Sequence, residues 1–103
     1  MTTEFEQEVS NVALADPQTK TPPMYALIMH NDDYTTMEFV VWVLVSVLGL
    51  AETKAISLML EIHHQGLAKV AILPKELAEV KQKQIMELAE QEEYPLLVTL
   101  EAQ

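Results

Sequence analysis

Three short hydrogen-bond acceptors stand in a row just before the most apolar stretch of this chain of 103 residues. Asn31, Asp32 and Asp33 are followed by a nearly continuous hydrophobic run over residues 39–50. Side chains of this type favour turns and the starts of helices. Acceptors that open onto an apolar element can bind a ligand that is both cationic and hydrophobic. A loop that leads into a buried core helix explains the same pattern.

The charge balance limits the classes of partner. Sixteen acidic and six basic residues give a formal charge of -10, which disfavours nucleic acid and anionic membranes because both attract Lys/Arg patches. The chain has no cysteine, which excludes disulfides, thiol nucleophiles and Cys-based zinc sites. Residues 39–50 are shorter than the roughly 20 residues of a bilayer span and too far from the start for a signal peptide. We therefore expect a cytoplasmic protein.

Periodicity and turn residues predict three strands and three helices after a flexible, acidic arm over residues 1–22. The strands are expected over 24–29, 68–73 and 96–100, and two of the helices over 52–65 and 75–92. Thr35 and Glu38 have the spacing of a capping box, which predicts that the first helix begins there and stops at Gly49. The order β-α-α-β-α-β predicts a single compact α+β domain over residues 23–103. Its three-stranded antiparallel sheet would be covered on one face by three helices.

The last helix has lysines in its first half and glutamates at its end. This order opposes the helix dipole, so Glu76, Glu79 and Lys81 are candidates for a polar docking face. A solvated helix surface is the other interpretation. The apolar positions expected on this helix are Leu77, Val80, Ile85, Leu88 and Ala89.

Three motifs resemble the ClpS family of proteolytic adaptors. They are NDDYT-x-MEFV over residues 31–40, LML-x-x-H-x-Q-G over 58–66 and PLL-x-TLE over 95–101. Their order and spacing match the family, so the resemblance covers residues 23–101. It implies an adaptor without cofactor or enzymatic activity. Such adaptors bind substrates that begin with Leu, Phe, Trp or Tyr (N-degrons) and deliver them to a ClpA- or ClpC-type AAA+ unfoldase.

The resemblance also implies a role for individual residues. Asn31, Asp33 and His63 would bind the α-amino group of the substrate. Asp32 and Thr35 would lie beside that group, near the second residue. The arm would trigger delivery. The pocket for the first side chain would be lined by Thr35, Met37, Val40, Met59, Ile62 and Leu96, and the N-terminal domain of the unfoldase would contact Glu76 and Lys81.

Residue chemistry supports this assignment independently. A free amino terminus carries three N–H donors and a positive charge, and it needs about three acceptors, some of them charged. Two methionines make a pocket wall adaptable, while Met37 at the helix start should crowd β-branched first residues. Protonated His63 can no longer accept a hydrogen bond from the ammonium, so the affinity for the substrate should decrease when the pH is lower than about 6.5.

The chain departs from the family pattern at a few positions. Thr36 stands where proline is common, which should loosen the loop. His30 replaces an aliphatic residue and could add a polar wall beside the amine. Ile62 adds a methylene where valine is frequent and should make the pocket shallower. Val45 beside Trp42 leaves an apolar patch that could mark a self-contact of an otherwise monomeric protein or a second partner.

Two other classes of function fit parts of the sequence. A metal-dependent hydrolase could use imidazoles and carboxylates as ligands, although no HExxH spacing is present. A ribosomal-stalk-like structural domain has a related βαα–βαβ order but lacks the acidic turn. The candidate metal ligands are His30, Asp32, Asp33, His63 and His64.

Overall fold

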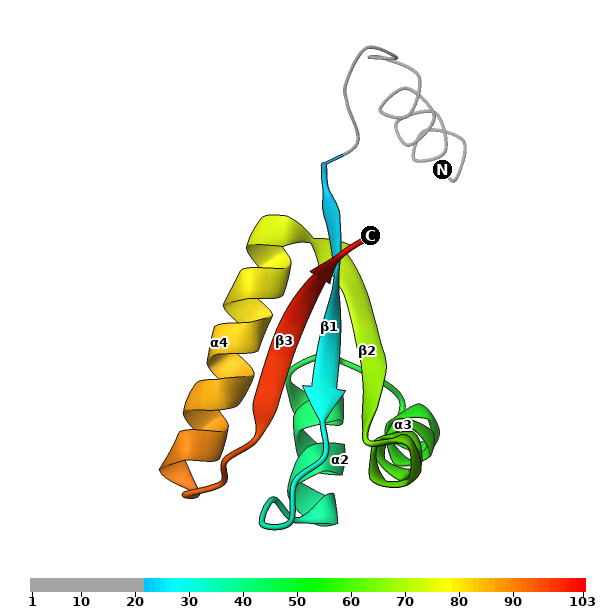
Figure 1. The fold of residues 1–103 in the computed structure, drawn as a ribbon, viewed down its shortest axis with the longest axis vertical. Coiled ribbons are helices and arrows are strands. Elements are labelled where there is room, and N and C mark those ends of the chain that lie inside the picture. Colours follow the sequence, from blue (N-terminus) through cyan, green and yellow to red (C-terminus); the bar gives the residue numbers. More distant parts are fainter. Residues whose placement is uncertain (1–21) are drawn as a thin grey trace, which may run out of the picture.

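A computed structural model describes residues 22–103, so the arm predicted over residues 1–22 lies, except for residue 22, outside the described part. The elements follow the predicted β-α-α-β-α-β order (Figure 1). They are β1 (Met24–His30), α2 (Met37–Ser46), α3 (Glu52–Gln65), β2 (Leu67–Pro74), α4 (Lys75–Gln91) and β3 (Leu97–Ala102). The predicted α+β class is therefore confirmed.

The three strands form one antiparallel sheet in the order β2-β1-β3 (Figure 1). Leu27 of the central strand pairs with Ala71 on one side and Leu100 on the other. The register against β2 shifts between Leu27 and Ile28, so that Val70 is an extra residue in β2. Because a bulge interrupts strict alternation, both Val70 and Ala71 can pack against the core.

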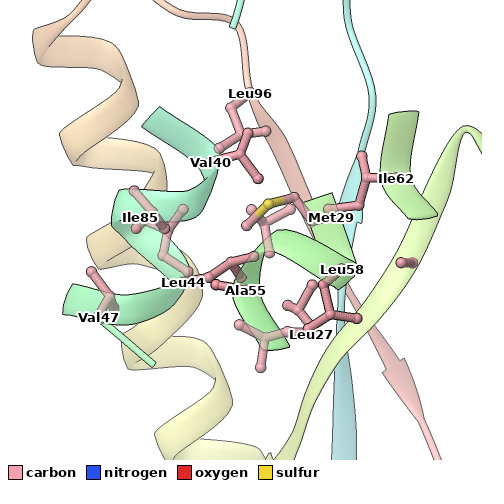
Figure 2. Packing of buried hydrophobic residues seen from close by; sticks show 14 of the residues in the cluster. Leu27, Met29, Val40, Leu44, Val47, Ala55, Leu58, Ile62, Ile85 and Leu96 are labelled. Atoms are coloured by element: carbon pink, nitrogen blue, oxygen red, sulfur yellow. The ribbon is translucent and has the colours of Figure 1, made fainter. Parts of the chain in front are cut away.

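The three helices cover one face of the sheet, and the core lies between the two layers. Leu27 and Met29 point into this core from β1, whereas Ala26 and Ile28 are buried on the opposite face of the strand. Figure 2 shows how strand and helix side chains meet in the cluster. A fully buried leucine contributes about 1.5–3 kcal/mol. The helical residues in the core are Phe39, Val40, Val43, Leu44, Val47, Ala55, Leu58, Ile62, Ala78, Ile85 and Ala89.

The start of α2 lies one residue later than the sequence predicts. The N-cap is Thr36, whose hydroxyl oxygen accepts from the Phe39 N–H at 3.2 Å. Thr35 lies before the cap, in the loop, where its hydroxyl donates to Asp32 at 2.7 Å. The capping box of Thr35 and Glu38 is therefore wrong. Thr36 also stabilises the junction between loop and helix rather than loosening it.

The helix ends differ in the role of glycine. α2 ends at Ser46, with Val47 as C-cap, and the chain turns at Gly49 with a φ of 69°. α3 ends as predicted, because Gly66 adopts the left-handed conformation at a φ of 90° and donates to Ile62 O. That conformation is readily available only to glycine.

The buried stripe of α4 differs from the predicted one. Ile85 and Ala89 are buried as expected, but the third buried position is Ala78, and Leu77 and Val80 are exposed. Alanine gives a weak hydrophobic signal in a sequence, so the two larger side chains suggested a stripe rotated away from the real one. The rotation leaves an apolar surface on the first half of α4.

Candidate functional site

The loop between β1 and α2 is shaped by the carboxylate of Asp32. Asp32 Oδ1 accepts from the N–H groups of Tyr34 at 2.8 Å and Thr35 at 2.7 Å, while Oδ2 accepts from the Thr35 hydroxyl at 2.7 Å. Partial burial opposes the ionisation of Asp32, but these three hydrogen bonds outweigh it and lower the pKa of the carboxyl below its usual range. Asp32 therefore acts within the loop as a charged organiser of its backbone.

The sheet brings this loop to the end of α3. Because β2 follows α3 directly and pairs antiparallel with β1, the last turn of α3 lies where β1 ends. The Asn31 N–H donates to the carbonyl of Gly66 at 2.9 Å, which ties the first loop residue to the C-cap of α3. His63 lies one turn before that cap. The sequence-distant Asn31 and His63 are thus neighbours through backbone geometry.

A cavity of about 420 Å³ lies between the loop, the start of α2 and the last turns of α3. Its mouth carries exposed polar side chains and its floor carries the buried Val40 and Ile62. Met37 and the half-buried Met59 form its walls. The lining residues are Asn31, Asp32, Asp33, Tyr34, Thr35, Thr36, Met37, Glu38, Val40, Met59, Ile62 and His63. The structure therefore brings together nine of the ten residues that the sequence assigned to the amine site and pocket.

Three acceptors at the mouth differ from Asp32 in having no side-chain hydrogen bond to another described residue. Asn31, Asp33 and His63 are exposed, and no side-chain hydrogen bond joins any of them to another residue of the range 22–103. An amide, a carboxylate and an imidazole around one opening can accept three hydrogen bonds from a cation. The arrangement can hold an ammonium group above an apolar floor.

Leu96 is the predicted pocket residue that the structure does not bring to the cavity lining. Its side chain is buried in the core, and Figure 2 shows it beside Val40, which itself forms part of the floor. Leu96 therefore belongs to the core around Val40 and not to the cavity lining. Conversely, Tyr34, Thr36 and Glu38 line the cavity although the sequence did not single them out for it. Their place in the same continuous segment was the available signal.

The candidates on α4 lie apart from this cavity. Glu76 is in the first turn of the helix, and Lys81 donates from Nζ to the carbonyl of Val47 at 3.0 Å. That carbonyl belongs to the C-cap of α2. Lys81 therefore has a structural contact of its own, in which a cation satisfies the carboxyl end of a neighbouring helix.

The candidate metal ligands are not gathered into a single set. Within residues 22–103, no group of three or more His, Cys, Asp or Glu side chains is placed to hold a metal ion. His30 hydrogen-bonds with the Thr99 hydroxyl at 2.8 Å across β1 and β3 and is absent from the cavity lining, so it forms no polar wall there. His64 packs edge-on against His63 but does not line the cavity either.

None of the helices in the described part is long and apolar enough to span a membrane.

The chain is similar to known proteins over most of its length. Residues 20–99 match the family described as ATP-dependent Clp protease adaptor protein ClpS. The ClpS adapter of Roseobacter denitrificans is 40% identical over 98 residues, which cover 95% of this chain and 87% of the relative. The ClpS adapter of Desulforapulum autotrophicum is 46% identical over 80 residues, which cover 78% of this chain and 77% of the relative.

A solved structure shares the fold. It is the structure of Agrobacterium tumefaciens ClpS2 bound to L-phenylalaninamide, with a TM-score of 0.77 and 34% sequence identity. The match covers 81% of this chain and 100% of that one. Phenylalaninamide combines a free α-amino group with a benzyl side chain. The acceptors at the mouth of the cavity are complementary to the first group, and the apolar floor is complementary to the second.

Proposed function

Because the chain belongs to the ClpS family of Clp protease adaptors, we propose that it binds the free amino terminus of proteins that begin with Leu, Phe, Trp or Tyr. It would deliver them to a Clp-type AAA+ unfoldase. The observation that carries the proposal is the set of open acceptors, Asn31, Asp33 and His63, above a floor of Val40 and Ile62. The relative bound to phenylalaninamide supports the same ligand chemistry.

The amino group would be bound by the three open acceptors. Asp33 supplies the charge-assisted hydrogen bond, which is shorter and about twice as strong as a neutral one. The Asn31 oxygen and a ring nitrogen of neutral His63 complete the set. Asp32 would act chiefly by holding the loop and by adding negative charge beside the amine, since its carboxylate already accepts three hydrogen bonds.

The first side chain of the substrate would enter between Met37 and Met59 and rest on Val40 and Ile62. Burying a side chain of the size of Leu or Phe contributes about 1.5–3 kcal/mol. Methionine walls adapt to different shapes, which suits a pocket that takes both Leu and Trp. Met37 borders the polar mouth, so a branched Cβ next to the bound amine would meet it, and Val and Ile should be disfavoured.

The unfoldase would dock on the first half of α4. Glu76 and Glu79 are exposed there beside the exposed side chains of Leu77 and Val80. A patch that mixes apolar and charged side chains is typical of the rim and core of a protein interface. Lys81 would contribute from the edge of this patch. The arm, whose residues 1–21 are not described, is the segment proposed to trigger delivery.

Peptides that differ only in their first residue test the proposal. Binding measured by fluorescence anisotropy should be tight for Phe, Leu, Trp and Tyr starts and at least tenfold weaker for Val, Ile and Met starts. Addition of a Clp-type unfoldase and its peptidase should then speed the degradation of a Phe-start reporter. Affinity that is independent of the first residue would contradict the proposed function.

A further inference from the structure

A second hollow lies on the other side of Met37, between α2 and α3. This hollow, the helix groove, has a volume of about 460 Å³. It shares the residues Met37, Glu38 and Met59 with the cavity described above, so the two hollows are adjacent. The residues lining the helix groove are Met37, Glu38, Val41, Trp42, Val45, Ser46, Glu52, Ile56 and Met59.

The groove is apolar and open to solvent. Trp42 is 50% exposed and Ile56 38% exposed, while Val45 is also exposed at the same surface. Trp42 packs against the buried Phe39 with 5.9 Å between ring centroids, so its ring is held as a wall of the groove. A rigid aromatic wall facing an exposed aliphatic one can bind an apolar side chain at low entropic cost.

We propose that the helix groove binds an apolar side chain at the third, fourth or fifth residue of the same substrate whose first residue fills the cavity. The inference rests on the proposed function, since that function places the amino terminus beside Met37. An extended peptide advances about 3.3–3.6 Å per residue. A chain leaving the cavity over Met37 and Glu38 therefore reaches the groove within a few residues.

Charge favours a substrate segment over a second copy of this chain. Glu38 and Glu52 border the groove, and the whole chain carries a formal charge of -10. Two such chains repel each other at an acidic face. A peptide with a cationic amino terminus is instead attracted to it, and its apolar side chain covers Trp42, Val45 and Ile56.

The test compares peptides with Phe first and glycines at positions three to five with peptides that carry a single Leu at one of these positions. Calorimetry should show one Leu position that raises affinity about threefold to tenfold, because an open groove buries only part of a side chain. Trp42 is the only tryptophan of the chain, so its emission should shift to shorter wavelength with that Leu peptide and not with the all-glycine peptide.

Two matched variants locate the effect. Ile56→Glu should remove the gain from Leu and leave the affinity for the all-glycine peptide unchanged. Leu60→Glu should keep the gain, because Leu60 is 43% exposed on the same helix but does not line the groove. These peptide comparisons on the unaltered protein stand even if a variant fails to fold.

The outcomes separate the two proposals. If the all-glycine peptide with Phe first does not bind, the proposed function fails. If it binds and Leu gives no gain at any position, the inference about the groove is overturned. It is also overturned if sedimentation shows a dimer that Ile56→Glu converts to monomer, because the groove would then be a self-contact.

Discussion

Two adjacent carboxylates in the loop between β1 and α2 have opposite surroundings. Asp32 accepts three hydrogen bonds from its own loop, whereas Asp33 has no side-chain hydrogen bond within the described residues and faces the cavity mouth. The carboxylate of Asp32 fixes the shape of the loop, and the carboxylate of Asp33 remains available to a ligand. The difference predicts that substitutions at the two positions separate stability from binding.

The largest expected effect is on binding at the open carboxylate. Asp33→Ala should weaken binding of a Phe-start peptide by about a hundredfold or more, because a desolvated ammonium loses its charged partner. The unfolding midpoint should stay unchanged, since the Asp33 side chain makes no hydrogen bond with residues 22–103. Anisotropy and thermal unfolding on the same preparation check both. A variant that binds normally would show that Asp33 is not part of the site.

His63 should make binding depend on pH. The affinity should fall about tenfold on acidification, because a protonated imidazole neither accepts a hydrogen bond from the ammonium nor attracts it. His63→Gln keeps an acceptor and should flatten the profile. His64→Gln, one residue away and outside the cavity lining, should leave the pH dependence intact. A flat profile for the unaltered protein would remove His63 from the acceptor set.

Asp32→Asn should lower stability more than binding. The loss should be about 1 kcal/mol at neutral pH, because the loop is partly exposed to solvent. The pKa of Asp32 is lowered from 3.8 in the folded state, so the stabilisation is complete above that value and disappears as the pH falls through the lowered folded pKa. Denaturant unfolding from pH 7 to pH 2.5 should show the two proteins converging in acid. Parallel curves would contradict the account.

The helix cap should affect stability with little effect on binding. Thr36→Ala should destabilise the protein by about 1 kcal/mol through the lost hydrogen bond to Phe39 N–H, and Thr36→Ser should restore most of it. Peptide affinity should change less than threefold in both variants. Chemical denaturation and anisotropy are the measurements. If the Ala and Ser variants were equally stable, the hydrogen bond of the Thr36 hydroxyl would not contribute to stability.

The order of elements and most of the site could be predicted from the sequence because they depend on local signals. Turn residues, the glycine stop at Gly66 and hydrophobic periodicity indicate the elements. The residues that the ClpS resemblance assigned to the site fall, except for Leu96, within two short motifs. The cap was misplaced because Thr35 and Thr36 are equally good caps in sequence. Only the structure shows that the Thr35 hydroxyl donates a hydrogen bond to Asp32.

Other features depend on long-range packing. Ala78 replaces Leu77 and Val80 in the buried stripe of α4 because the sheet and the other helices select the face of the helix. Leu96 lies in the core rather than in the cavity lining. The helix groove is lined by residues of α2 and α3, two helices that a loop separates in the sequence. The exposed pair of Trp42 and Val45 predicted an interaction surface, but only the coordinates show that this surface adjoins the cavity.

The most direct test of the account compares a Phe-start peptide with its N-acetylated form on the unaltered protein and on Asp33→Ala. Acetylation removes the charge and most of the donors, so the unaltered protein should prefer the free amine by about a hundredfold or more. In Asp33→Ala this preference should fall to less than about tenfold. Equal binding of the two peptides by the unaltered protein would contradict recognition of the amino terminus by this cavity.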